Sequence, residues 1–228
     1  MLSRTCRRAG WHALAAAALF AWLPAHAGSF EDFFSAVRRN DGRAITSLVA
    51  RGFDPNTVNE KGQSGLMLAL GDASAEAARA LVNSPGINVE VRNASDESPL
   101  MLAALKGQLE LVKVLVAKDA DINKTGWTPL HYAATGTTAE QPAIVAFLLE
   151  NHAYIDAASP GDTTPLMMAA YYGKADTVAL LLAEGADPFL RNNQKLSAID
   201  MAKKADRKEI AEQIADTIRR RQPNRGQW

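Results

Sequence analysis

The chain has 228 residues, of which 47% are apolar and 22% are charged, and its 25 basic residues balance its 25 acidic ones. A chain of this length and composition can bury a sizeable core as one soluble unit. The balanced charge excludes a general electrostatic attraction to nucleic acid.

The first 27 residues have the layout of a secretory signal peptide. Arginines precede an uninterrupted apolar run at 13–23, and Ala25-His26-Ala27 supplies small residues before a cut at Gly28. The run is shorter than the roughly 20 apolar residues that span a bilayer. We therefore expect cleavage after Ala27 and an exported, periplasmic protein. An uncleaved signal that tethers the chain to the membrane is the alternative.

Cleavage would also remove Cys6, the only cysteine of the chain. The mature protein would then contain no thiol and no disulfide, so packing alone would hold it together. Thiol chemistry is excluded for such a chain. Cleavage removes three arginines and no acidic residue, which leaves a net charge of about −3.

The elements in chain order begin with two short helices separated by a break at Asn40-Asp41-Gly42. Apolar side chains recur at helical spacing on either side of that break. They are Phe30, Phe33, Phe34 and Val37 before it, and Ala44, Ile45, Leu48 and Val49 after it. Gly52 and Pro55 then end the second helix and begin an extended loop.

The following units open with a hydroxyl residue that can cap a helix. Ser98-Pro99, Thr128-Pro129 and Thr164-Pro165 combine that cap with a proline at the first helical position, where a missing N–H costs nothing. Ser64 begins a weaker copy in which Gly65 replaces the proline, and Ser197 begins the last unit. Each unit predicts two helices joined by a tight turn.

One stretch recurs through the chain and is clearest in Trp127-Thr128-Pro129-Leu130-His131-Tyr132-Ala133-Ala134. Its anchoring apolar residue returns about every 33 residues, a period typical of ankyrin repeats. The anchors are Leu66, Leu100, Leu130, Leu166 and Ile199. From residue 29 to 217 the sequence therefore resembles the ankyrin repeat family.

The resemblance implies an all-α ankyrin repeat solenoid of about six helix-turn-helix repeats with short β-hairpin loops. We place this domain at residues 28–218, after the signal peptide at 1–27, and we expect a basic flexible tail at 219–228. Two departures stand out. The loop at 121–127 is too short for a full hairpin, and residues 135–142 lengthen the turn inside the fourth repeat.

Residues with catalytic or metal-binding potential are scarce. After the signal peptide, His131 and His152 are the only histidines, and no pair of residues has metal-ligand spacing. The resemblance implies that His131 bonds the threonine at the start of its helix, and a catalytic or metal role is the alternative. We expect no enzyme activity, no metal and no cofactor. A cryptic enzyme would need a site that the sequence does not reveal.

The resemblance also implies that a protein partner, rather than nucleic acid, binds to a concave face built from loop tips and first helices. The loops contribute Arg92, Glu97, Trp127, Thr163 and Arg191, and the ends of the first helices contribute Leu105, Lys106, Tyr171 and Tyr172. Large aromatic residues dominate many protein interfaces. Alternatively, Trp127, Tyr171 and Tyr172 pack on one another and cover the groove floor.

The function expected from the sequence is therefore that of a monomeric protein-binding module. Small exported ankyrin repeat proteins of bacteria resemble this combination of signal peptide and repeats, and some of them accompany catalases in peroxide defence. A secreted effector or inhibitor of another protein is one alternative. A membrane-tethered adaptor is another.

Overall fold

The computed structural model describes residues 24–221, and these form twelve α-helices. In chain order the helices are α1 (Pro24–Arg38), α2 (Gly42–Ala50), α3 (Gly65–Gly71), α4 (Ala75–Val82), α5 (Pro99–Leu105), α6 (Leu109–Val116), α7 (Pro129–Thr135), α8 (Gln141–Glu150), α9 (Pro165–Tyr171), α10 (Ala175–Ala183), α11 (Ala198–Lys204) and α12 (Lys208–Arg221). The predicted six helix pairs are confirmed.

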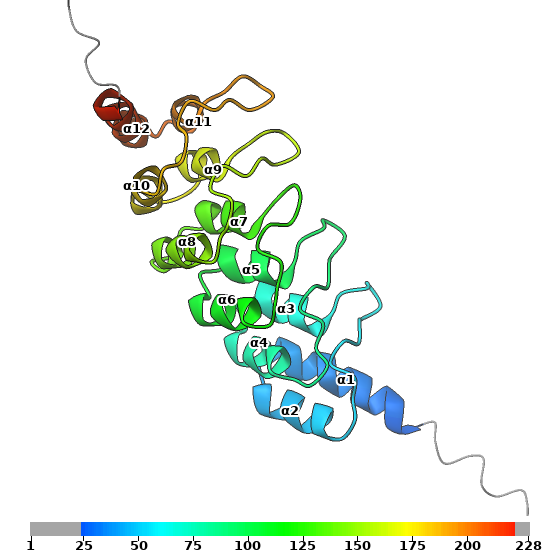
Figure 1. Ribbon diagram of the computed structural model, residues 1–228. Helices are drawn as coiled ribbons and strands as arrows, with labels where there is room; N and C mark the ends of the chain where they lie inside the picture. Colours follow the sequence, from blue (N-terminus) through cyan, green and yellow to red (C-terminus); the bar gives the residue numbers. More distant parts are fainter. Residues whose placement is uncertain (1–23, 222–228) are drawn as a thin grey trace, which may run out of the picture.

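The helix pairs stack side by side into an elongated two-layered solenoid (Figure 1). Odd-numbered helices form one layer, even-numbered helices form a second, which we call the rear layer, and each odd-numbered helix packs against the next. The loops between pairs all project on the side of the odd-numbered helices. We call the surface between these loops and the odd-numbered helices the concave face.

The core lies between the two layers and continues from pair to pair. Alanines such as Ala69, Ala103 and Ala133 are fully buried where consecutive odd-numbered helices meet. Larger residues such as Leu81, Leu115 and Leu148 are buried from the rear layer. The alanines allow consecutive odd-numbered helices to approach closely, so neighbouring repeats stack without gaps.

Hydroxyl caps begin five of the odd-numbered helices, as predicted. The side-chain oxygen of each cap accepts the backbone N–H of the residue three positions later, which satisfies one of the free donors at a helix start. The caps are Ser64, Ser98, Thr128, Thr164 and Ser197. Repeat register is thus set by local chemistry as well as by packing.

Four of the projecting loops are hairpins, each closed by one backbone hydrogen bond. The bond joins residues four apart and is present in Asn59–Gln63, Asn93–Glu97, Ser159–Thr163 and Asn192–Leu196. An isolated bridge pairs Val58 with Ser64. The loop between α6 and α7, residues 117–128, is shorter than its counterparts at 151–164 and 184–197 and lacks the closing bond. The predicted short loop is confirmed.

Polar side chains tie each projecting loop to the next one. Asn56 accepts the backbone N–H of Asn88, Glu90 that of Asp121, Asn123 that of Tyr154, and Asp156 that of Asp187. The four acceptors occupy the same place in successive repeats. These bonds fix the loops relative to one another and so shape one wall of the concave face.

The glycine at position 65 and the lengthened turn of the fourth repeat each have a packing reason. At Gly65 a Cβ atom would lie 2.8 Å from the ring of Phe33, so glycine lets that buried ring sit against the start of α3. In the lengthened turn of the fourth repeat, Thr138 packs on Gly107, and the Gln141 side chain donates to the carbonyl of Leu105 at 3.0 Å. The insertion therefore packs back onto the third repeat.

The C-terminal boundary differs from the prediction. Helix α12 continues through Arg221, whose guanidinium donates to the carbonyls of Leu182 and Ala186. Residues 219–221 therefore belong to the repeat domain and not to a flexible tail. Residues 222–228 lie outside the described residues, as does the predicted signal up to residue 23. Within residues 24–221, the helices are too short or too polar to span a bilayer.

Candidate functional site

A row of apolar side chains follows the floor of the concave face. Each odd-numbered helix from α3 onward places one at its fourth position after the cap: Leu68, Leu102, Tyr132, Met168 and Met201. All five are only partly buried or sit at the edge of the core. This row was not among the predicted site residues, although Tyr132, which stands between His131 and Ala133 in the repeated stretch, marks its position.

A hollow of about 290 Å³ opens on this floor between the second and third repeats. The missing side chain of Gly71 leaves this space open, because a Cβ atom there would meet nothing within 4 Å. The equivalent positions of the following repeats carry Leu105, Thr135 and Tyr171. The lining includes Leu68 and Leu102 on the floor and the predicted site residues Arg92 and Glu97 on the loop side. These two predicted residues therefore do lie together.

Charged groups in this half of the concave face are bonded to one another. Glu97 accepts from Tyr132 Oη at 2.7 Å and from Asn93 Nδ2 at 2.6 Å. Burial, reinforced by the adjacent Glu97 carboxylate, raises the pKa of the Tyr132 hydroxyl, which keeps it protonated as a donor.

The arginine on the same loop is likewise paired. Arg92 Nη2 lies 2.5 Å from Glu90 Oε2, and Lys124 forms an ion pair with Asp96 on that loop. The Lys124 ammonium lowers the pKa of the Asp96 carboxyl. These contacts join the projecting loops at 83–98 and 117–128, and they pair charged groups that could otherwise bind a partner.

The three aromatic residues of the predicted site lie at two separate places. Trp127 precedes the N-cap of α7 and meets the ring of His131 edge-on, with centroids 5.3 Å apart. Tyr171 ends α9 and Tyr172 caps it, with their ring centroids 4.4 Å apart. Trp127 is thus at the start of a first helix and the tyrosines are at the end of one.

The remaining predicted site residues are spread along the face. Leu105 ends α5 and is half-buried, and Lys106 caps that helix and is exposed. Arg191 is exposed on the last loop, where it bonds the Lys195 carbonyl at 2.7 Å and Asp200 at 3.2 Å. Thr163 is half-buried and its carbonyl accepts from His131. The inserted turn at 136–140 separates Leu105 and Lys106 from the tyrosines along the chain.

His131 has the structural role that the sequence favoured. Its ring is fully buried, and Nδ1 lies 3.2 Å from the Thr128 amide N and 2.9 Å from the Thr128 hydroxyl. Nε2 lies 2.8 Å from the Thr163 carbonyl. A neutral ring protonated on Nε2 satisfies all of these partners. Burial lowers the pKa of His131, although the bond to Thr163 opposes the shift.

Replacing His131 with methionine should remove a pH dependence of stability. Methionine fits, because Met101 and Met167 hold this place in other repeats and their sulfurs accept from the cap amides. A histidine with a lowered folded pKa stabilises fully above its unfolded pKa of about 6.5 and loses that contribution as pH falls further. At pH 7.5 the variant should be less stable by about 1 kcal/mol, through loss of the Thr163 bond.

Urea denaturation of both proteins between pH 7.5 and pH 5 measures this difference. The stability advantage of the parent should shrink toward pH 5, because the unfolded chain then binds a proton that the folded chain excludes. Other titrating groups cancel in the comparison. An advantage that stays constant or grows toward pH 5 would contradict the neutral buried ring.

Metal-binding geometry is not found in residues 24–221, where no three histidine, cysteine, aspartate or glutamate side chains gather as ligands. His152 is exposed on a loop with positive φ. The described residues thus offer a surface with projecting loops and one apolar row. A surface of this kind suits recognition of another macromolecule.

Comparison with protein families matches most of this solenoid. A model of ankyrin repeats in three copies matches residues 33–125 and 85–159, and a second ankyrin model matches residues 142–202. The chain belongs to the ankyrin repeat family. Ankyrin repeats generally mediate protein–protein interactions, and proteins of this family are typically non-enzymatic interaction modules.

Curated ankyrin repeat proteins match parts of the chain. The nuclear factor NF-kappa-B p105 subunit of Gallus gallus is 28% identical over 177 residues, which is 75% of this chain and 18% of that protein. An ankyrin repeat and KH domain-containing protein of Caenorhabditis briggsae is 40% identical over 95 residues, 40% of this chain and 4% of that protein. The chain therefore spans less than a fifth of the length of these relatives.

Two solved bacterial structures share the fold. An ankyrin repeat domain from Acinetobacter baumannii has a TM-score of 0.67 at 23% identity and covers 81% of this chain and 96% of its own. The other is from a complex of a predatory endopeptidase of Bdellovibrio bacteriovorus with an immunity protein. It has a TM-score of 0.69 at 23% identity, with 82% and 97% covered. At this identity the likeness establishes the fold alone.

Proposed function

We propose that this ankyrin repeat protein binds a partner protein on its concave face, and that the half nearer the C-terminus makes the main contact. The observation that carries the proposal is a tyrosine pair, half-buried Tyr171 and exposed Tyr172, beside an apolar floor. Tyr172 is 53% exposed although its ring packs on Tyr171, and Met168 and Met201 continue the row beneath. Rigid aromatic side chains in a partly covered site supply much of the binding energy in protein interfaces.

Two exposed lysines at the ends of first helices supply further contacts. Lys106 and Lys204 have no ion-pair partner among residues 24–221. Arg92, Glu97, Lys124 and Arg191, by contrast, are bonded within the molecule. Unpaired groups can bond a partner without first breaking internal contacts, so the free energy gained on binding is larger at the two lysines.

Replacing both tyrosines should abolish partner binding without unfolding the protein. The tagged protein and a Tyr171→Ala/Tyr172→Ala variant are used to capture proteins from a periplasmic extract, with retained circular dichroism as the check of folding. We expect the affinity for the captured partner to fall at least about tenfold. This corresponds to a loss of about 1.4 kcal/mol or more of binding free energy, as is typical when interface anchors are removed. Trp127→Ala should have a smaller effect, because Trp127 is half-buried against His131.

Tyr154→Ala is the matched control. Tyr154 is 68% exposed but follows the end of α8 in the rear layer, away from the floor of the concave face. A partner that is retained by the double tyrosine variant, or lost equally from the Tyr154 variant, would refute the concave-face assignment. The captured protein also separates the alternatives. An enzyme that loses activity on binding indicates an inhibitor, and a catalase indicates peroxide defence.

Export to the periplasm is part of the same proposal. The arginine head, apolar run and small residues before Gly28 support it. The intact mass of the protein recovered from cells tests the cleavage. A chain that begins at Gly28 supports export and release, and a chain that retains residues 1–27 supports the membrane-tethered adaptor.

A further inference from the structure

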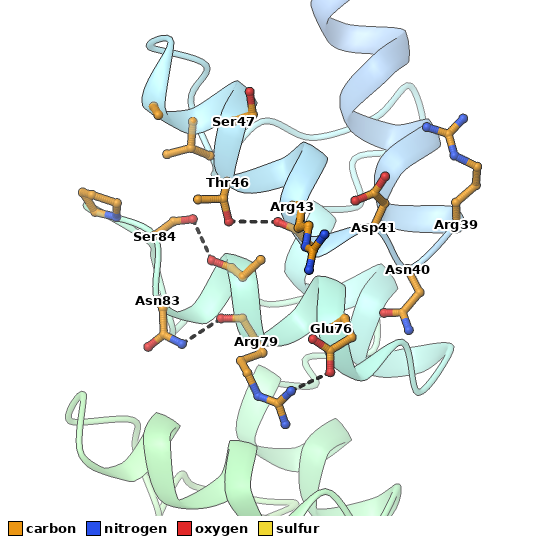
Figure 2. Close-up of a pocket in the computed structure, with 15 residues that line it drawn as sticks. Arg39, Asn40, Asp41, Arg43, Thr46, Ser47, Glu76, Arg79, Asn83 and Ser84 are labelled. Carbon is orange, nitrogen blue, oxygen red and sulfur yellow. Dashed lines mark hydrogen bonds and ion pairs between the residues drawn. The ribbon is translucent and has the colours of Figure 1, made fainter.

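A second surface, unrelated to the concave face, lies on the rear layer between α2 and α4. It is a groove of about 1230 Å³ whose walls are the outward sides of these two helices (Figure 2). The helices nearly touch at Gly42, where a Cβ atom would lie 2.6 Å from the Glu76 carbonyl oxygen. Small side chains, Ala50 and Ala80, line the groove between them.

Polar side chains inside the groove are turned toward their own helices. The Thr46 hydroxyl donates to the Gly42 carbonyl at 2.8 Å, and the Ser84 hydroxyl donates to Ala80 at 2.9 Å. Asn83 Nδ2 likewise donates to the Arg79 carbonyl at 2.9 Å. Their methyl and methylene groups, together with Val49 and Pro85, therefore leave a largely apolar floor.

Three arginines from three different elements border this floor: Arg39 from the turn after α1, Arg43 from α2 and Arg79 from α4. The two acidic residues of the groove are already engaged. Asp41 caps α2 through the Ala44 amide, and Glu76 pairs with Arg79 at 2.6 Å.

The remaining charge is therefore positive. Arg43 has no hydrogen-bond or ion-pair partner within residues 24–221, and it lies over the middle of the groove in Figure 2. Arg39 has one side-chain bond, to the Ser35 hydroxyl at 2.8 Å. The groove thus combines an apolar floor with cationic groups that are free to pair with carboxylates.

We propose that this rear groove binds an acidic amphipathic helix of a partner protein. The apolar side of the helix would lie on the floor between α2 and α4, as a third helix packs into the groove between two others. Its carboxylates would pair with Arg39 and Arg43, since a guanidinium fork matches a carboxylate in bidentate geometry. The site lies on the opposite layer from the concave face, so it stands or falls independently of the function proposed above.

A designed peptide tests the site directly. The probe is a fluorescein-labelled helix of about 18 residues, long enough for helix formation, with leucine on one face and glutamate on the other. Fluorescence anisotropy measures its binding to the full chain. Arg39→Glu/Arg43→Glu should weaken binding by at least about tenfold through charge reversal, and exposed Thr46→Trp should do so by filling the groove.

Lys118→Glu/Lys208→Glu is the matched control, because it changes the net charge equally at exposed positions that do not line the groove. It should leave binding unchanged, and a peptide with serine in place of leucine should not bind. The proposal is overturned if the glutamate–leucine peptide does not bind the parent protein, if both rear-groove variants bind normally, or if the control loses binding equally. Binding of anionic vesicles through the same arginines, without the peptide, would indicate a lipid surface and also overturn it.

Discussion

Replacing Gly173 with alanine should destabilise the protein by about 3 kcal/mol, the upper range for overpacking a core. A Cβ atom at this position would lie 2.2 Å from the Ala134 carbonyl oxygen and 2.9 Å from the Ala169 Cα atom. Both are backbone atoms of the adjoining helices α7 and α9, so no side-chain rotation can relieve the clash. Urea denaturation followed by circular dichroism measures the free energy of unfolding.

Gly71→Ala is the control for this substitution. Gly71 ends α3, and a Cβ atom there would meet nothing within 4 Å. Alanine in a helix at an open site should stabilise the protein by about 0.5–1 kcal/mol, because it restricts the unfolded chain. Equal effects of the two substitutions would show that contact between α7 and α9 does not depend on glycine.

The same clash should affect the proposed binding face. Gly173 directly follows Tyr172 and accepts a hydrogen bond from Arg207 through its carbonyl. A shift of α9 away from α7 would move the tyrosine pair relative to the floor. Residual partner binding by Gly173→Ala should therefore fall even under conditions in which the variant remains folded.

The repeat fold was predictable because its determinants are local and recur. The hydroxyl caps at Ser98, Thr128 and Thr164 and the prolines that follow them specify helix starts from adjacent residues alone. The spacing of the anchoring apolar residues then fixes how the pairs stack. For the same reason the shortened loop and the lengthened turn were visible as departures from a period.

The arrangement of the candidate site was harder to predict, because it depends on contacts between repeats. The family pattern marks Glu97 as a variable contact position, but its carboxylate is bonded to Tyr132, 35 residues away. Trp127 and Tyr171 belong to consecutive repeats, yet one lies at the start and the other at the end of a first helix. Position within a repeat, and not only membership of neighbouring repeats, decides which side chains meet.

Long polar side chains also reach across repeats. Arg207 directly precedes α12, and its guanidinium reaches back to α9. Gln141 and Arg221 make equivalent bonds to carbonyls at the ends of α5 and α10. No local signal distinguishes such arginines from surface ones, since the carbonyls they cap lie more than 30 residues away.

Replacing Arg207 with methionine should cost about 3 kcal/mol of stability and loosen the end of the solenoid. Its guanidinium donates to the carbonyls of Ala169 and Ala170 at 3.0 Å and to that of Gly173. These carbonyls lie at the end of α9, where backbone donors run out; only that of Ala169 also accepts the Gly173 amide among the bonds described. Burial lowers the pKa of Arg207 but leaves it charged, so methionine removes charged hydrogen bonds as well as the caps.

Arg219→Met provides the comparison, because Arg219 is exposed and pairs only with Asp216 one turn away on α12. It should change stability by less than about 0.5 kcal/mol. Hydrogen exchange should show faster opening of α9, α11 and α12 in Arg207→Met and unchanged protection of α3 to α6, since repeats contact only their neighbours. Uniform loss of protection, or equal stability of the two variants, would mean that Arg207 does not hold the last repeat on α9. If the local result holds, Arg207 is an anchor of the last repeat, and the position of the tyrosines next to it depends on that anchor.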